Sequence, residues 1–455
     1  MNKTEIMAPV GSWESLAAAI EAGADSVYFG IEYLNMRARS SANFTTKDLH
    51  IIVRRCREAG VRTYLTLNTV MYPEDLPLMR TIVDNAKEAG LDAIIASDIA
   101  VMQYANEVGV EVHLSTQLNI ANTEALRFYA QFSDVVVLAR ELNMEQVAQI
   151  HRDIIEQDIR GRKGELIRIE MFCHGALCMA VSGKCYLSLN NYNASANRGA
   201  CVQVCRRGYT VRDKETGNEL DIDNQYIMSP KDLKTIHFLN KMLDAGVTVF
   251  KIEGRARGAE YVRTVVSCYK QAIAAYEAGE YNRTEEENDM LRAQGLPTIE
   301  DKLKMWTQQM ARVFNRGWWD GYYLGQHLGE WTHRYGSLAT RKKVYVGKIT
   351  NYFKQIGVAE VLVEAAAISE GEEYLVTGET TGAYESTLAN IRIDMKQSEK
   401  SIIAAGQNLA EARKAASAET KTALKGVFFS MKTDKLLHRG DKLYRLEVVE
   451  NRNES

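Results

Sequence analysis

The feature that most constrains the fold is a phrase that recurs along the first part of the chain. It reads "EAGADSVYFG", "EAGVRTYLTLN", "EAGLDAIIASD", "NEVGVEVHLSTQ", "DAGVTVFKIEG" and, without the glycine, "AQFSDVVVLARE". Glycine readily takes the left-handed conformation that closes a helix, and the apolar run after it is too short to be another helix. Such runs are typical of strands buried on both faces of a parallel sheet. The phrase therefore predicts alternating helices and parallel strands.

Eight strands of this kind are expected. They cover residues 5–9, 26–30, 62–67, 92–96, 111–115, 134–139, 166–172 and 247–252. Eight βα units over about 250 residues indicate an α/β fold of the TIM type, a (βα)8 barrel. The alternative is an open doubly wound sheet. That fold usually carries a Gly-rich phosphate turn after its first strand, and "APVGSWES" is no such turn.

Two further regions follow the barrel, which we place at residues 1–275. Residues 276–341 read as helices and then an aromatic passage, "FNRGWWDGYYLGQHLGEWTHRYG", which we interpret as packing between domains rather than an RNA-stacking surface. From 342 to 455, short alternating runs such as "KVYVGKITNYF" predict a small antiparallel β domain that resembles a β-barrel. The polar segment 396–426 interrupts this domain as a helix or loop.

Composition excludes several classes of protein. The formal net charge is −3, so any binding of RNA must depend on a local basic patch. No run of about eighteen apolar residues is present, which argues against a membrane span. The start, "MNKTEIMAPVGSWESL", lacks an apolar signal core, so we expect the protein in the cytoplasm. In that compartment the seven cysteines are not a disulfide framework.

Five of the seven cysteines lie between positions 173 and 205. They fall in an insertion at 173–229, after the seventh strand, which is far longer than an ordinary βα loop. Four of them have the spacing C-x6-C-x15-C-x3-C, and soft thiolates in this number suit zinc or an iron–sulfur cluster. Zinc favours two tight pairs, whereas only the second pair is tight. The alternative, small buried cysteines, would require this clustering to be accidental.

Several stretches carry a resemblance to a known family. They are "EMFCHGALCMAVSGKCYLS", "MAPVGSWESLAAAIEAGADSVYFG", "HLSTQLNIAN", "NRGACVQVCRRGY" and "SPKDLKTIHFLNKMLDAGVTVFKIEGRARGAEYV". Over about residues 5–275 the chain resembles the bacterial collagenase-like peptidases, several of which are iron–sulfur proteins of oxygen-independent hydroxylation. It looks most similar to the branch that makes 5-hydroxyuridine at the tRNA wobble position, with prephenate as the hydroxyl source.

The resemblance implies a cytoplasmic tRNA-modifying hydroxylase whose partners are tRNA and prephenate. It implies that the ligands of a [4Fe-4S] cluster are Cys178, Cys185, Cys201 and Cys205. Siblings in ubiquinone synthesis take their fourth cysteine from further downstream, where this chain reads "QYIMSPKDL" and has none. The pair in "ACVQVCRR" therefore favours the RNA-modifying branch.

Other candidate residues lie at strand ends, where barrel enzymes place their active sites. The candidate catalytic residues are Glu170, His174 and Glu253. His174 is expected to donate a hydrogen bond or proton near the cluster, or else to be structural, and Glu253 to act directly or to fix a neighbouring cation. The two carboxylates of prephenate favour basic partners, for which the candidates are Arg140, Lys251, Arg255 and Arg257.

A local basic patch occupies residues 198–214, with five basic residues and one acid. Its candidate phosphate ligands are Arg198, Arg206 and Arg207, and the alternative is a solvated basic hairpin. Candidate stacking platforms for an unstacked base are Tyr186, Tyr192 and Tyr209.

Three other functions stay open. A peptidase is the second enzyme hypothesis, although the chain has no H-E-x-x-H and no G-x-S-x-G motif. A dyad of Cys173 and His174 is conceivable, but adjacent residues of a strand point to opposite faces. The remaining alternatives are a noncatalytic tRNA-binding accessory protein and hydroxylation of ribosomal RNA.

Overall fold

The computed structural model describes residues 4–38, 44–217, 219–220, 228–325, 329–333 and 336–449. It divides into two compact units. The first consists of Met1–Gly11, Ala22–Arg257 and Thr264–Leu338, and the second of Ser12–Glu21, Gly258–Arg263 and Ala339–Ser455. Each unit is described by itself.

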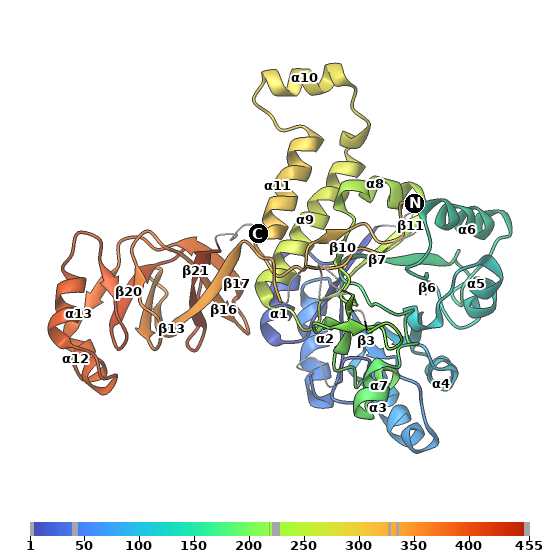
Figure 1. Ribbon diagram of the computed structural model, residues 1–455, viewed down its shortest axis with the longest axis horizontal. Helices are drawn as coiled ribbons and strands as arrows, with labels where there is room; N and C mark the ends of the chain where they lie inside the picture. Colours follow the sequence, from blue (N-terminus) through green and yellow to red (C-terminus); the bar gives the residue numbers. More distant parts are fainter. Residues whose placement is uncertain are drawn as a thin grey trace. The chain divides into compact units, whose positions relative to one another are not determined.

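The first unit is built around a closed barrel of eight parallel strands (Figure 1). They are β1 (Glu5–Pro9), β2 (Ser26–Phe29), β3 (Arg62–Leu67), β4 (Ala93–Ala96), β5 (Glu111–Leu114), β6 (Val135–Val137), β7 (Arg168–Ala176) and β11 (Val247–Ile252). Each strand pairs with the next, and β11 closes the ring by pairing with both β1 and β7. The TIM-type barrel predicted from the recurring phrase is confirmed.

Helices fill the connections between the strands. They are α2 (Leu49–Glu58), α3 (Leu76–Ala89), α4 (Ile99–Val108), α5 (Thr123–Ala130), α6 (Met144–Glu156), α8 (Leu239–Asp244) and α9 (Ala259–Glu277). Gly90 and Gly109 end α3 and α4 in the left-handed conformation, as the phrase requires. Helix α2 turns Ile52, Val53 and Cys56 inward, so Cys56 is one of the small buried apolar residues of the core.

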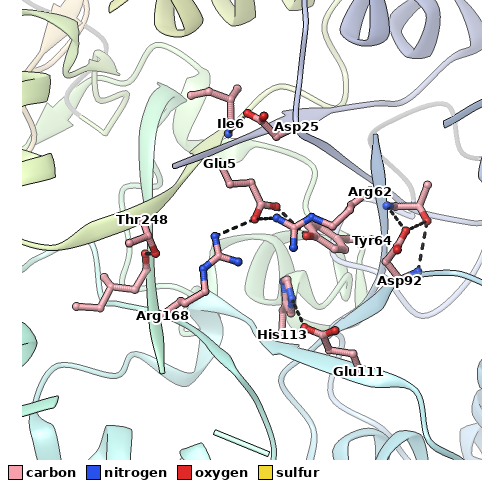
Figure 2. A network of polar contacts seen from close by, with 12 residues as sticks. Glu5, Ile6, Asp25, Arg62, Tyr64, Asp92, Glu111, His113, Arg168 and Thr248 are labelled. Carbon is pink, nitrogen blue, oxygen red and sulfur yellow. Dashed lines mark hydrogen bonds and ion pairs between the residues drawn. The ribbon is translucent and has the colours of Figure 1, made fainter. Parts of the chain in front are cut away.

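The amino end of the barrel is closed by a network of buried charges (Figure 2). Glu5 accepts hydrogen bonds from Tyr64 at 2.7 Å and Arg168 at 3.0 Å, and it is paired with Arg62. Burial opposes ionisation of Glu5, but the two arginines outweigh it and hold the pKa of this carboxyl below its usual range. Attraction between opposite charges therefore joins β1, β3 and β7 at this end, which has a structural role.

The seventh strand runs past its predicted end at 172. It continues to Ala176 because the short strand β10 (Asp232–Lys234) pairs antiparallel with its last residues, and β12 (Trp318–Trp319) pairs with β10. The cysteine-rich insertion thus leaves the barrel after Ala176. It contains α7 (Leu187–Tyr192) and the strands β8 (Val211–Arg212) and β9 (Glu219–Leu220). Helices α10 (Glu285–Ala293) and α11 (Ile299–Ala311) complete the first unit.

The second unit contains a seven-stranded sheet whose neighbouring strands are all antiparallel. In spatial order the strands are β17 (Gly382–Thr387), β16 (Glu373–Gly378), β21 (Lys442–Val448), β13 (Arg341–Phe353), β14 (Val358–Val363), β20 (Phe428–Lys432) and β18 (Arg392–Asp394). The predicted antiparallel C-terminal domain is confirmed. The segment 396–426 contributes most of α12 (Met395–Ala404), all of α13 (Leu409–Ala416), and β19 (Thr422–Ala423), which pairs with β15 (Ile368–Ser369).

The second unit also includes a helix from the beginning of the chain. Helix α1 (Trp13–Glu21) packs on β17, with Ala18, Leu375 and Ala383 in one buried cluster. Gly382 lies so close to α1 that an added Cβ would come within 2.9 Å of the Ala18 nitrogen. Only glycine allows this approach.

Across the part of the chain that the structure describes, we find no helix with both the length and the apolar character that crossing a membrane requires.

Candidate functional site

A cavity of about 230 Å³ opens at the carboxyl ends of the barrel strands. Its lining combines strand ends, the loops that follow them and the cysteine-rich insertion. Polar and sulfur-bearing residues in this lining include Tyr28, Arg37, Thr66, Arg140, Cys178, Cys185, Cys201, Cys205, Arg206, Lys251, Glu253, Arg255, Arg257 and Arg316. This is the end of the barrel at which TIM-type enzymes place their chemistry.

All four cysteines with the predicted ligand spacing line this cavity as free thiols. Cys178 is exposed and the other three are half-buried. Burial raises the pKa of the Cys205 thiol, although the neighbouring Arg206 acts in the opposite direction. Among the described residues, no three His, Cys, Asp or Glu side chains are arranged to hold a single metal ion.

Two contacts fix the insertion against the barrel. The Arg206 guanidinium donates to the carbonyl oxygens of Leu177 at 2.5 Å and Pro230 at 2.7 Å, and so joins the two ends of the insertion. Gly199 abuts the loop after β2, where a Cβ would meet the Asn35 carbonyl oxygen at 2.3 Å. Arg206, predicted to bind substrate, thus lines the cavity but uses its donors to hold the backbone.

Basic residues dominate the cavity. Seven of the residues that line it are basic, and Glu253 is the one acid among them in the described part of the chain. Glu253 accepts a hydrogen bond from Arg37 at 2.8 Å and another from the Tyr28 hydroxyl at 3.2 Å. Burial favours its neutral form, but Arg37 and Arg255 outweigh burial and lower the pKa of Glu253. The carboxylate is therefore ionised and fixes the cations around it.

The inner part of the cavity brings together the predicted small-acid ligands. Lys251 donates to Glu170 at 2.7 Å and lies over the rings of Tyr28 and Phe172, 4.8 and 5.5 Å from their centroids. Arg140 lies 5.5 Å from the centroid of the same Phe172 ring. Glu170 is fully buried behind Lys251, so it orients the ammonium group rather than reaching the cavity itself.

Arg255 is buried in the wall. It donates to Thr66 at 2.8 Å and Asn35 at 3.1 Å, and burial lowers its pKa to about 10. It remains charged at neutral pH and contributes positive potential to the cavity, while its hydrogen bonds hold the loop after β2.

Cys173 and His174, the dyad that a peptidase would require here, do not line the cavity. The Cys173 thiol is buried and contacts the Lys251 carbonyl at 3.4 Å, whereas His174 contacts the Tyr269 hydroxyl through Nδ1 at 3.4 Å. Burial lowers the pKa of His174 to about 3, so the ring is neutral. The two side chains face different neighbours and do not form the dyad of a cysteine peptidase.

The other predicted RNA ligands lie outside the cavity. Arg198 is paired with Asp75 and lies 4.1 Å from the centroid of Tyr72. Arg207 lies 5.2 Å from the centroid of Tyr192 and bonds its hydroxyl. Tyr186 is exposed, while the Tyr209 hydroxyl donates to the Val204 carbonyl. Arg198 therefore lies over Tyr72, and Arg207 over Tyr192. The sequence did not indicate Tyr72.

Sequence reasoning missed two of the basic residues that line the cavity. Arg37 belongs to the loop after β2, and Arg316 to the aromatic passage that was interpreted as packing between domains. Arg316 is held by Asp232 of β10 at 3.3 Å. Their only sequence signal is a basic residue within a loop, which is too common to single out.

Comparison with known proteins identifies relatives under two kinds of name. The model of Peptidase family U32 matches residues 11–333. A protein named "Collagenase" from Porphyromonas gingivalis is 59% identical over 450 residues, 99% of either chain. The tRNA hydroxylation protein P1 of Bacillus subtilis is 31% identical over 359 residues, 77% of this chain and 78% of that protein. A 23S rRNA 5-hydroxycytidine synthase of Escherichia coli is 30% identical over 394 residues, 85% of this chain and 55% of that protein.

These identities correct one expectation. The branch of tRNA hydroxylation proteins was expected to be the most similar, but the relative named "Collagenase" is far more similar than the Bacillus subtilis protein. The family model covers every barrel strand except β1, the insertion and most of the aromatic passage. The chain belongs to peptidase family U32.

Proposed function

We propose that this protein is an iron–sulfur enzyme that hydroxylates RNA, forming 5-hydroxyuridine at the wobble position of tRNA with prephenate as the hydroxyl source. The observation that carries the proposal is the meeting of four free thiols with an excess of basic residues in one cavity at the catalytic end of the barrel.

The donor set fits a [4Fe-4S] cluster. Cys178, Cys185, Cys201 and Cys205 would hold it, since thiolates are its usual ligands. When bound, the cluster would supply the redox chemistry that no side chain offers. The basic residues nearby would balance the charge of four thiolates.

Prephenate matches the inner part of the cavity. Its two carboxylates require cations, and Arg140 and Lys251 lie on the same aromatic ring there. Glu170 would orient Lys251, and Glu253 would orient Arg37, so both carboxylates act in this proposal as positioning residues. His174 is neutral and lies outside the cavity lining, where it supports β7 rather than proton transfer.

A peptidase is the second candidate because the relative at 59% identity is named "Collagenase". The Cys173–His174 dyad does not support it, because the two side chains face different neighbours. Hydroxylation of ribosomal RNA, and a noncatalytic role in binding tRNA, are further outcomes of the tests below.

The first test is the cofactor. The full chain, purified without oxygen, is expected to contain about four irons and four sulfides. Each change of Cys178, Cys185, Cys201 or Cys205 to Ala should remove the iron. Cys56→Ala is the matched control, because Cys56 is a buried thiol on α2, outside the cavity. Stoichiometric zinc, or no metal in carefully handled protein, would overturn the cluster.

The second test is the activity. The holoprotein with prephenate and unmodified tRNA should yield 5-hydroxyuridine, detected by mass spectrometry of nucleosides, and the Cys201→Ala protein should yield none. Ribosomal RNA and gelatin are incubated in parallel. Product from ribosomal RNA alone would move the assignment to that substrate, and cleavage of gelatin that the Cys201→Ala protein retains would favour the peptidase. Binding of tRNA without any product would indicate the accessory role.

A further inference from the structure

The basic residues of the cavity form two separate groups, each arranged around one phenylalanine. In the inner group, Arg140 and Lys251 lie over Phe172. In the outer group, Arg257 and Arg316 lie over Phe314, 3.5 and 5.1 Å from its centroid. Four of the seven cavity cations thus lie near one of two phenylalanine rings.

The register of β7 separates the two groups. Phe172 pairs with Lys251 of β11, whereas Ala176, four residues further along, pairs with Asp232. Asp232 holds Arg316 through both its backbone nitrogen and its guanidinium, at 3.1 and 3.3 Å. Four residues of extended strand span about 13 Å, so the part of β7 beside Asp232, the partner of Arg316, lies about that far along the strand from the part beside Lys251.

Chemistry distinguishes the two groups as well. The outer group consists of two guanidinium groups, whose planar forks match the oxygens of a phosphate. Asp232 already pairs with Arg316, and a phosphate that accepts from guanidinium groups here would be a second anion beside this pair. The inner group contains one ammonium, already oriented by Glu170. A compact acid suits the inner group, and a phosphate suits the outer one.

We propose that Arg257 and Arg316 are a phosphate subsite for the nucleotide that carries the target base, separate from an inner carboxylate subsite at Arg140 and Lys251. The inference rests on the proposed function and adds the site that receives the nucleotide backbone. A base taken out of an RNA loop enters a pocket while its phosphates stay at the mouth. The thiols line the same cavity, so a base held in this way extends toward them.

The test uses the iron-loaded full chain with Arg257→Gln, Arg316→Gln and Arg140→Gln. Arg312→Gln is the matched control, because Arg312 is exposed at the end of α11 and does not line the cavity. Three probes are titrated: an anticodon stem–loop RNA with uridine at the wobble position, uridine 5′-monophosphate, and prephenate. Iron content and circular dichroism report whether each variant is folded.

Either outer variant should lower the affinity for both phosphate-bearing probes roughly tenfold. It should also reduce the salt dependence of RNA binding by about one counterion. Affinity for prephenate should stay within about twofold, and Arg140→Gln should show the reverse pattern. If the outer variants weaken prephenate while sparing RNA, or change neither, the subsite is overturned. If the wild type binds uridine monophosphate through Arg316 but binds no RNA, the phosphate subsite stands and the tRNA assignment fails.

Discussion

The barrel holds two buried glutamates, one at its amino end and one behind the cavity, and the two carboxylates have different partners. At the amino end, Glu5 accepts from Tyr64 and Arg168 and pairs with Arg62 (Figure 2). Behind the cavity, Glu170, the third residue of β7, pairs with Lys251 through one oxygen, and its other oxygen has no hydrogen-bond partner in the described part of the chain.

This difference extends to the charge of each end. Acids and bases alternate in the network at the amino end, whereas the cavity at the carboxyl end has seven basic residues and one acid in its described lining. A network in which acids and bases pair with one another stabilises the fold without a ligand. A cavity with an excess of basic residues is stabilised when it binds anions. The comparison therefore predicts that changes at the amino end alter stability, and changes at the carboxyl end alter ligand binding and catalysis.

The largest effect is expected from Lys251→Met. It leaves the Glu170 carboxylate buried without its cation, which should lower the free energy of unfolding by about 4 kcal/mol and abolish hydroxylation. Adding Glu170→Gln should restore most of the stability but none of the activity, as measured by urea unfolding and nucleoside analysis. Recovery of activity in the double variant would show that the pair has only a structural role.

A smaller loss of stability is expected from Glu5→Gln at the other end. The change leaves Arg62 and Arg168 without their shared carboxylate and should lower the free energy of unfolding by about 2–3 kcal/mol. Hydroxylation per folded molecule should match that of the wild type at a temperature where both are folded. A catalytic defect in this variant would break the division between the two ends.

An effect on binding alone is expected from Tyr192→Ala. Tyr192 is half exposed on the insertion and stacks with Arg207, so its loss should weaken binding of the anticodon stem–loop by about tenfold. Phe128→Ala is the matched control, since Phe128 has similar exposure but lies on α5, outside the insertion and the cavity lining. An equal loss of RNA affinity in both variants would show that Tyr192 does not contact the RNA.

The smallest effect concerns pH. Burial favours neutral Glu111, but His113 and Lys163 outweigh it and lower the pKa of Glu111 from 4.5 to about 2. Because the folded pKa is depressed, the stabilisation is present above pH 4.5 and is lost as the pH falls toward 2.

Glu111→Gln should therefore destabilise the protein by about 1 kcal/mol at neutral pH, after allowing for solvent screening, and progressively less below pH 4.5. Urea midpoints at several pH values measure this, with the exposed Glu145→Gln as control. A difference that stays constant with pH would show that Glu111 acts through packing alone.

The sequence predicted the barrel because the relevant signals are local. Each apolar run is long enough for one strand, and Gly90 and Gly109 end helices where the phrase requires it. Three-residue β10 carries no such pattern, since only its pairing with β7 makes it a strand. The extension of β7 was therefore missed, and with it the anchoring of Arg316 by Asp232.

The candidate site was predictable only in part, for a related reason. The four cysteines were found because their spacing is unusual, and the structure brings them to one cavity. The residues next to an arginine in the sequence do not determine which way its side chain points. Arg206 turns toward the Leu177 carbonyl and Arg198 toward Asp75, although both belong to the same basic patch. The roles assigned to these residues stay predictions until the variants are measured.

Helix α1 packs on β17, so the second unit is assembled from segments that precede and follow most of the barrel in the sequence. During synthesis α1 leaves the ribosome before these strands, and its buried face, with Ala18, meets Leu375 and Ala383 only after the rest of the barrel has followed. A protein truncated before Ala339 would leave that face bare. The C-terminal strands therefore cannot be removed without exposing α1. The newly made chain must complete these strands before α1 can be buried.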